Sequence, residues 1–485
     1  MMGSVPERTS TYVSSSAVWA CKTAAETKRK NEMRMVVPSE RQFPAACHVF
    51  FPPMIHRILL PLLVLASASH AGNWPEWRGP SAQGHANASG LPETWSETSH
   101  IAWKAELPGR GHSTPVMWGA QIWLTTAFEK AATPEEAKRR LESNTGDQPL
   151  TVLGSVSLHA LCVDRSSGKI LHDIELLNVK DPQWAHQLNS YASPSPILAD
   201  GRLYAHFGSF GTVALDTQTL KVLWKNEELH VMHENGPGST AVLHGDKLIA
   251  HFDGSDQQFI AAFDTNTGKV AWKTPRSGDM DPRPQQRKAY GTPLVVTING
   301  QPQVVSSAAN NVYSYDPATG QELWKIHYGE LGFSMSTVPV ADDQQIYFST
   351  AFGKSAVIAL KYAGLKTPEV AWRNNKNAPK MCSPVLHNGL LFYVDDGGIV
   401  SCVDTKTGEA FYRERIGGKF SASPMIADGK LYFCSREGVV TIINAAKEFK
   451  ILAQNTLDGP IMASPIADGS ALFIRTDKAL YKIGK

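Results

Sequence analysis

SPSPILADGRLYAHFGSFGTVALDTQTLKVLW, residues 193–224, contains four short runs of branched and aromatic side chains separated by turns rich in Gly and Asp. The run from Arg202 to His206 alternates in polarity, and a Gly-rich reversal then leads into the run from Thr212 to Leu215. Runs of this length and composition are typical of antiparallel strands joined by hairpins. Four such strands within about 40 residues form one blade of a β-propeller.

The same unit recurs along the rest of the chain. Third strands repeatedly end in Asp, and several of these open an Asp-x-x-Thr-Gly turn, as from Asp264 to Gly268. Fourth strands carry a Trp at 224, 272, 324 and 372. The first strands share a signature, which reads Ser113-Thr114-Pro115, Ser195-Pro196, Ser239-Thr240, Gly291-Thr292-Pro293, Val338-Pro339, Ser383-Pro384, Ser423-Pro424 and Ser464-Pro465. These signatures mark eight blades.

The two ends of the repeat region complement each other. The last unit, from Ser464 to Lys485, has room for three strands, whereas the run from Ile101 to Lys104 resembles a fourth strand with no partners before it. Pairing both ends in one blade removes free sheet edges, which invite aggregation. The sequence therefore predicts an all-β, eight-bladed β-propeller of four-stranded antiparallel blades, closed by the N-terminal strand, with Trp103 beside Leu472 and Leu480.

The residues that recur from blade to blade are expected to serve the fold. The Asp of each Asp-x-x-Thr-Gly turn accepts hydrogen bonds from backbone amides, and its Gly takes the left-handed conformation that the turn requires. A Trp at the end of the fourth strand is suited to the wide outer gap between splayed blades. Recurrence per blade, rather than once per protein, favours a structural role over a catalytic one.

The N-terminal part of the chain divides into three segments. Residues 1–53 are polar and lack periodicity, so we interpret them as a disordered or mis-assigned extension. Residues 54–71 resemble a signal peptide: Arg57 precedes an apolar core, and Ser69-His70-Ala71 supplies a cleavage site. Residues 72–100 are interpreted as a linker before the propeller of residues 101–485. We therefore expect a protein exported to the periplasm or secreted, without a membrane anchor in its mature form.

The net charge and the positions of the cysteines bear on nucleic-acid binding and on disulfide formation. A net charge of +2 without a basic block gives no indication of nucleic-acid binding, and we expect a monomer. The four cysteines after the cleavage site lie singly within strand patterns, at Cys162, Cys382, Cys402 and Cys434. One disulfide is compatible with an oxidising compartment, but buried free thiols are favoured.

Long loops gather on one face, where first strands begin and second-to-third hairpins turn. An insertion from Phe128 to Leu153 carries a helix signal at Thr133-Pro134-Glu135-Glu136, and the next three crossovers are long. Because inner strands of successive blades are neighbours, residues at their starts are expected to face one cavity at the channel mouth. The candidate ligand-binding residues are His112, Trp184, His186, Asn189, Tyr191, His233, Glu234, Asn235, Lys288 and Tyr290.

Other interpretations of these loops stay open. The residues can be ordinary solvated loop positions. A metal site built from His186, His230, His233 and Glu234 is one alternative, although the spacing of these residues is not diagnostic. We predict neither a metal site nor catalytic residues.

The repeat elements resemble those of pyrroloquinoline-quinone (PQQ) repeat propellers. The resemblance lies in the Ser-Pro starts, the Ala-Asp-Gly and Asp-x-x-Thr-Gly turns and the terminal Trp residues. Trp74-Pro75-Glu76-Trp77-Arg78-Gly79-Pro80 more closely resembles a motif near the start of a group of exported bacterial PQQ-like proteins of unassigned function. That superfamily includes quinoprotein alcohol dehydrogenases and the non-catalytic outer-membrane-assembly lipoprotein BamB. The resemblance implies an eight-bladed fold over residues 101–485.

The same resemblance gives two functional hypotheses. The first is a non-catalytic binding or scaffold protein that takes a protein partner or a small polar ligand on the face over blades 1–4. The alternative is an enzyme: a divergent quinoprotein oxidoreductase using PQQ and calcium, or a hydrolase-like activity of the His-Glu-Asn loop. The sequence lacks the adjacent cysteine pair and the carboxylate-rich calcium site of those dehydrogenases. No cofactor is therefore predicted.

Overall fold

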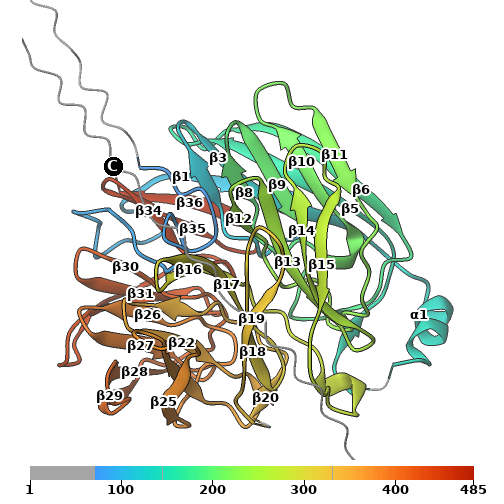
Figure 1. The fold of residues 1–485 in the computed structure, drawn as a ribbon. Helices are drawn as coiled ribbons and strands as arrows, with labels where there is room; N and C mark the ends of the chain where they lie inside the picture. The colour runs from blue at the N-terminus through green and yellow to red at the C-terminus, as the bar shows by residue number, and fades with distance from the viewer. Residues whose placement is uncertain (1–71, 145, 330, 485) are drawn as a thin grey trace, which may run out of the picture. The chain divides into compact units, whose positions relative to one another are not determined.

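Eight four-stranded antiparallel sheets form the body of the molecule in the computed structural model (Figure 1), which describes residues 72–144, 146–329 and 331–484. The predicted extension and signal peptide lie outside these residues. Blade 1 consists of β2 (Val116–Trp118), β3 (Gln121–Ala131), β5 (Leu153–Asp164) and β6 (Ile170–Lys180), and blade 2 of β8 (Ile197–Ala199), β9 (Arg202–His206), β10 (Thr212–Asp216) and β11 (Val222–Asn226). Blade 3 consists of β12 (Val242–His244), β13 (Lys247–Asp253), β14 (Gln258–Asp264) and β15 (Val270–Pro275), and blade 4 of β16 (Leu294–Ile298), β17 (Gln301–Ser307), β18 (Asn311–Tyr315) and β19 (Glu322–His327).

Blades 5–8 follow in the same order. Blade 5 consists of β21 (Val340–Ala341), β22 (Gln345–Ser349), β24 (Val357–Lys361) and β25 (Glu369–Asn374), and blade 6 of β26 (Val385–His387), β27 (Leu390–Val394), β28 (Ile399–Asp404) and β29 (Ala410–Arg415). Blade 7 consists of β30 (Met425–Ala427), β31 (Lys430–Cys434), β32 (Val439–Asn444) and β33 (Ile451–Thr456), and blade 8 of β34 (Ile466–Asp468), β35 (Ala471–Arg475), β36 (Ala479–Gly484) and β1 (Ile101–Glu106). The predicted all-β, eight-bladed fold is confirmed.

The two ends of the repeat region share blade 8, as predicted. Strand β1 pairs antiparallel with β36, with Ala105 opposite Leu480 (blue beside red in Figure 1). The Trp103 ring lies 6.0 Å from that of Phe473, in a core cluster that also contains Leu472. The N-terminal strand therefore closes the ring of blades and covers the edge of β36.

The Asp and Trp of neighbouring blades act together. In blade 3, Asp264 accepts hydrogen bonds from the backbone N–H of Asn266 and Thr267, at 3.1 and 2.9 Å. The Trp224 ring of blade 2 packs against Gly268 of that turn, and its indole donates to the Thr265 carbonyl at 2.9 Å. Because Gly268 has a φ of +69° and a ring in the place of a Cβ, only glycine fits there. These residues are structural, and they join blades rather than strands.

A ring of hydroxyl groups links the first strands around the channel. Each Ser or Thr of this hydroxyl ring accepts a hydrogen bond from the backbone N–H of the equivalent residue one blade earlier, at 2.9 to 3.1 Å. Its members are Thr114, Ser195, Thr240, Thr292, Ser383, Ser423 and Ser464. Blade 5 has Val338 at this position, which supplies no acceptor for the N–H of Thr292. The recurring Ser-Pro signature is thus explained as inter-blade hydrogen bonding.

This ring predicts opposite effects for two substitutions. Ser423→Ala removes the acceptor of the buried Ser383 N–H and should lower the free energy of unfolding by about 1–3 kcal/mol, because a buried donor is left unpaired. Val338→Thr is nearly isosteric and adds the missing acceptor, so it should raise stability by about 0.5–1.5 kcal/mol. Urea denaturation of both variants tests the assignment. A loss of stability in both contradicts the hydrogen-bonding role.

The segment from 72 to 100, expected to be a linker, lies along the inner strands of the propeller. Trp74 forms an antiparallel bridge with Met117 of blade 1, and Ala88 forms a parallel bridge with Gly469 of blade 8. Between them the Arg78 guanidinium donates to the Pro384 carbonyl of blade 6 at 2.6 Å. The segment therefore contacts the channel-facing strands of blades on several sides of the ring.

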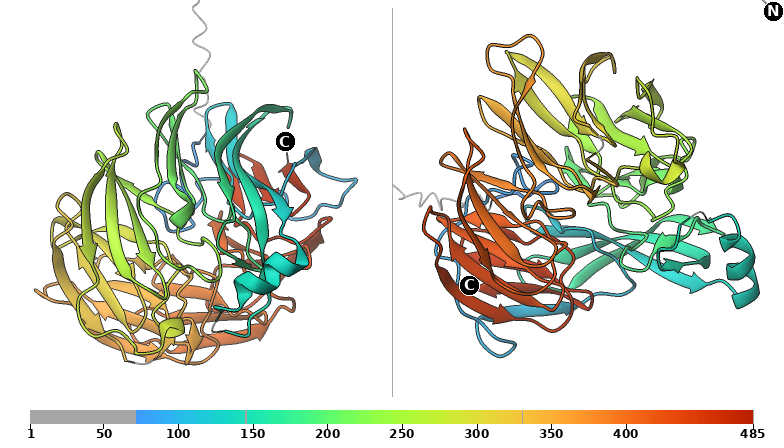
Figure 2. Two further views of the ribbon diagram at one scale, coloured as in Figure 1. Left: turned by 90° about the vertical axis from the view of Figure 1, so that its right-hand side faces the viewer. Right: turned by 90° about the horizontal axis from the view of Figure 1, so that it is seen from below.

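The long loops add small elements on the face where first strands begin. Within the blade 1 insertion, helix α1 (Pro134–Leu141) lies at the periphery (Figure 2), with Thr133 as its N-cap, as predicted. Strand β4 (Leu150–Thr151) pairs with β7 (Ala185–His186), and β20 (Gly332–Phe333) pairs with β23 (Phe352–Gly353). Two 3-10 turns, η1 (Gly208–Phe210) and η2 (Pro284–Gln286), complete the elements. None of the helices in the described parts of the chain is long and apolar enough to cross a membrane.

A fully buried ion pair within blade 3 also contacts blade 4. The Arg276 guanidinium binds both carboxylate oxygens of Asp253, at 3.0 and 2.8 Å, and both side chains are 0% exposed. Arg276 also donates to the hydroxyls of Ser306 and Tyr315, at 2.7 and 3.2 Å. No local sequence pattern marks this network, because its members are far apart in the chain. The four described cysteines are buried free thiols, as favoured above.

Candidate functional site

A cavity of about 560 Å³ opens on the face that carries the long loops. Its wall includes the residue two positions before the hydroxyl-ring position in each of the eight blades, a set that we call the cavity ring. The cavity ring is His112, Ser193, Gly238, Tyr290, Ser336, Met381, Ser421 and Met462. Side chains alternate along an extended segment, so a residue two positions away faces the same side. The topology of the propeller thus directs one residue per blade into a single cavity.

The floor of the cavity comes from two sources. Four hydroxyl-ring residues, Thr114, Ser195, Thr240 and Ser464, line it. Trp77, from the N-terminal segment, lies among them, and its indole donates to the Ser464 hydroxyl at 3.2 Å. The floor therefore offers a large aromatic surface next to a ring of small polar groups.

The upper wall is held by contacts between successive crossover loops. The backbone N–H of His186 donates to the Asn235 carbonyl at 3.2 Å, and the Asn189 amide donates to the same carbonyl at 2.8 Å. The Asn235 amide in turn donates to the Tyr290 hydroxyl at 3.0 Å. Each of these four residues lines the cavity. Loops that begin far apart in the sequence are in this way fixed to one another rather than left free in solvent.

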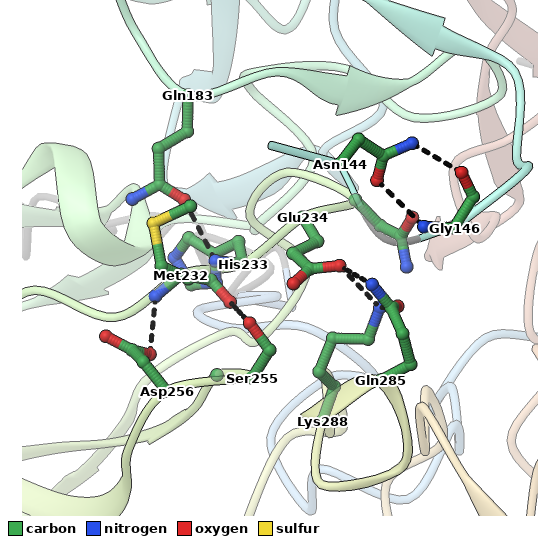
Figure 3. A network of polar contacts seen from close by, with 12 residues as sticks. Asn144, Gly146, Gln183, Met232, His233, Glu234, Ser255, Asp256, Gln285 and Lys288 are labelled. Carbon is green, nitrogen blue, oxygen red and sulfur yellow. Dashed lines mark hydrogen bonds and ion pairs between the residues drawn. The ribbon is translucent and has the colours of Figure 1, made fainter. Parts of the chain in front are cut away.

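One charged network reaches the cavity (Figure 3). The Lys288 ammonium lies 3.5 Å from Glu234 and also donates to the Gln285 side chain, which donates to Glu234. Burial lowers the pKa of Lys288, and the Glu234 carboxylate opposes that shift. Lys288 and Gln285 line the cavity, whereas Glu234 stands behind them. The network presents a positive charge that is already partly neutralised.

His112 is held in its neutral form. Burial lowers the pKa of its imidazole to about 3, and the guanidinium of Arg475 adds to this shift. At neutral pH, one ring nitrogen of His112 therefore donates a hydrogen bond and the other accepts one. This side chain can orient a polar ligand without contributing charge.

Six of the ten predicted ligand-binding residues line the cavity: His112, His186, Asn189, Asn235, Lys288 and Tyr290. The other four do not. Trp184 and Tyr191 are buried, and the Tyr191 hydroxyl donates to the Gln183 carbonyl at 2.7 Å. The His233 side chain accepts a hydrogen bond from the backbone N–H of Ser209 at 2.9 Å. The side chains of Trp184, Tyr191 and His233 pack or form hydrogen bonds inside the loops, and Glu234 lies behind Lys288. All four therefore stabilise the loops rather than line the cavity.

The cavity also extends beyond the four blades over which a site was expected. Blades 5–8 and the N-terminal segment contribute Phe333, Phe352, Met381, Met462 and Trp77. The spacing from the Ser-Pro signature identifies Met381 and Met462 from sequence alone, because both precede that Ser by two positions. No comparable signal exists for Trp77, which reaches the cavity from a segment outside the repeats.

The lining does not fit PQQ bound through calcium. Calcium takes six to eight oxygen ligands with carboxylates prominent among them, and Asp147 is the single carboxylate residue among the described residues of the lining. Within the described ranges, no three His, Cys, Asp or Glu side chains are grouped to hold a metal ion. The alternative His186, His230, His233 and Glu234 metal site is therefore not assembled. We therefore assign no chemical step to calcium-bound PQQ or to a metal ion at these four residues.

A second polar cluster lies on the flank of blade 1. The Ser157 hydroxyl is 2.7 Å from Nε2 of His159, whose Nδ1 is 2.6 Å from Asp173. These distances match those of a Ser-His-Asp triad, but the Ser157 hydroxyl also donates to Glu175 at 2.5 Å. Its strand pairs with β3 and β6 on both sides, so the backbone N–H groups serve the sheet rather than a developing oxyanion. We assign this cluster no catalytic role.

Comparison with known proteins gives one family and several distant relatives. The sequence profile described as "Outer membrane protein assembly factor BamB" matches residues 93–374 and 363–448. BamB of Yersinia pestis is 25% identical over 330 residues, which cover 66% of this chain and 75% of that protein. Quinohemoprotein alcohol dehydrogenase ADH-IIG of Pseudomonas putida is 28% identical over 166 residues, which cover 30% of this chain and 21% of that enzyme.

One solved structure shows the shared fold. Quinohemoprotein alcohol dehydrogenase from Comamonas testosteroni superposes with a TM-score of 0.56 at 12% identity, covering 87% of this chain and 82% of that one. At this identity the likeness concerns the arrangement of blades alone.

Proposed function

The chain belongs to the family described as outer membrane protein assembly factor BamB, and from that premise we propose that it is a binding protein whose cavity holds a small organic ligand. One observation carries the proposal: all eight blades and the N-terminal segment converge on one cavity. A volume of about 560 Å³ is in the range of small-molecule sites, roughly 300–1,000 Å³. Export to the periplasm or outside the cell is part of the same proposal.

The chemistry of the lining supports a ligand with both apolar and polar parts. Aromatic and thioether groups of Trp77, Phe333, Phe352, Met381 and Met462 offer contact surface. Neutral imidazole, amide and hydroxyl groups offer directional hydrogen bonds, which fix orientation in such sites. No arrangement of nucleophile, base and oxyanion donors accompanies them in the described lining, so binding is favoured over catalysis.

A protein segment inserted into the same cavity is the second candidate. The name of the Yersinia pestis relative describes an assembly factor, which acts on other proteins. The quinoprotein oxidoreductase hypothesis is not favoured, because the lining offers too few carboxylates for calcium.

Filling the cavity should abolish binding without unfolding the protein. Ser336 belongs to the cavity ring and is half-buried, so Ser336→Trp places a large ring inside the cavity. Isothermal titration calorimetry uses three naphthalene probes of one size: 1-naphthalenesulfonate, 1-naphthalenemethanol and 1-naphthylmethylammonium. We expect the parent protein to bind at least one probe, and the affinity to fall by more than tenfold in Ser336→Trp, since the ring occupies the space of the ligand.

The matched control is Ser470→Trp, an exposed position in the β34–β35 turn on the opposite face. It should leave probe binding unchanged. Failure of all three probes to bind the parent protein at millimolar concentration contradicts the small-molecule proposal, as does equal binding by Ser336→Trp.

A further inference from the structure

Two arginines beside the cavity are buried without a carboxylate partner. Arg475 is 3% exposed, and its guanidinium donates to the Ser113 carbonyl and hydroxyl, at 2.9 and 2.7 Å, and to the Thr125 carbonyl at 3.1 Å. Arg78 is 2% exposed and donates to the carbonyls of Pro384 and Gln83, at 2.6 and 2.8 Å. Among the residues that the structure describes, no acidic side chain forms an ion pair with either one.

These two charges are poorly compensated. Burial lowers the pKa of each guanidinium to about 9, so both remain charged at pH 7. The Nε atoms of both are buried and have no hydrogen-bond partner within the described part of the chain. Glu76, two residues before Arg78, does not offset the charge fully, because burial raises its pKa to about 7. An uncompensated buried charge is costly, and a nearby anion relieves that cost.

Arg475 stands directly behind the wall of the cavity, and Arg78 is adjacent in sequence to a residue of its floor. The partner of Arg475 is Ser113, which lies between the lining residues His112 and Thr114. Arg78 follows Trp77 of the floor. A third guanidinium, that of Arg436, donates to the lining residues Ser421 and Met381, at 2.8 and 3.1 Å. Positive charge therefore surrounds the cavity on several sides.

Negative charge near the lining belongs to carboxylates that are exposed or already engaged, and Asp396 and Glu437 interact with the Arg436 guanidinium. The Asp147 carboxylate is exposed, so solvent screens it. Glu234 is engaged with Lys288 and Gln285. The groups that face the cavity itself are mostly neutral hydrogen-bonding side chains, which complete the coordination of an anion without opposing it.

We infer that the cavity selects small organic anions, molecules with a carboxylate or sulfonate on an apolar body, through the field of Arg475, Arg78 and Arg436. This inference rests on the proposed function, because it specifies the charge of the ligand in the same cavity. Two unit charges about 10 Å apart at an effective dielectric constant of about 20 interact strongly enough to change affinity by roughly tenfold. The combined field of these guanidiniums therefore favours an anion over a neutral ligand of the same size.

The three naphthalene probes test the inference directly, because they share a ring and differ in charge. The parent protein should bind 1-naphthalenesulfonate at least tenfold more tightly than 1-naphthalenemethanol, and 1-naphthylmethylammonium most weakly. Equal affinities for the anion and the alcohol overturn the inference but leave the binding proposal intact. Absence of binding by every probe refutes both.

Arg475→Gln removes one charge and keeps an amide that can donate to Ser113. We expect affinity for the sulfonate to fall about tenfold and affinity for the alcohol to change less than threefold. Arg475→Lys is the matched control, which keeps the charge and should keep the preference. An unchanged preference in Arg475→Gln contradicts the inference. If that variant fails to fold, Arg436→Gln carries the same comparison at a less buried site.

Discussion

Arg276→Met is expected to lower the free energy of unfolding by about 3–5 kcal/mol, because it leaves the Asp253 carboxylate buried and uncompensated. Both side chains are 0% exposed, and their two hydrogen bonds are 3.0 and 2.8 Å long. The same guanidinium lies over the Tyr313 ring, with its central carbon 4.9 Å from the ring centre. Guanidinium chloride denaturation, followed by tryptophan fluorescence, measures the change.

Two further variants separate the ion pair from side-chain size. Arg139→Ala breaks the pair with Glu136 on the surface of α1, where the arginine side chain is 69% exposed, and should change stability by less than about 1 kcal/mol. Asp253→Leu combined with Arg276→Met should recover much of the loss, because no buried charge remains. A single Arg276→Met variant as stable as the parent shows that water or a shifted neighbour compensates Asp253.

Deleting residues 101–107 is expected to destroy the cooperatively folded state and to cause aggregation. The deletion removes β1, so the edge of β36 loses its partner from Ala479 to Ile483. It also removes Trp103, whose indole donates to the Arg165 carbonyl of blade 1 at 3.1 Å. An exposed strand edge pairs readily with other molecules, so aggregates should form. Size-exclusion chromatography with light scattering and thermal unfolding record the outcome.

The control for this deletion replaces α1 with a flexible linker. Helix α1 has no buried residue and lies outside the blades, so its replacement should cause neither aggregation nor loss of cooperative unfolding. A monomer of unchanged stability after removal of residues 101–107 contradicts closure of the ring by the N-terminal strand.

The fold is predictable from the sequence, because its signals are local and repeated. The Ser-Pro starts, the Asp264-type turns and the Trp224-type strand ends each specify a short element, and their recurrence fixes the number of blades. The position of the cavity followed as well, since inner strands of successive blades must be neighbours. His112 and Tyr290 line the same cavity for that reason, despite their distance in the chain.

The directions of the loop side chains and the pairing of buried charges depend on contacts that form only in the folded protein. His233 and Asn235 are two residues apart in an irregular loop, yet the first turns inward to Ser209 and the second lines the cavity. The direction of each side chain depends on its contact with a neighbouring loop, and no periodic sequence pattern encodes such a contact. The same holds for Trp77 and Arg475, whose partners lie hundreds of residues away. Side-chain contacts of that range arise from the closure of the ring rather than from local sequence.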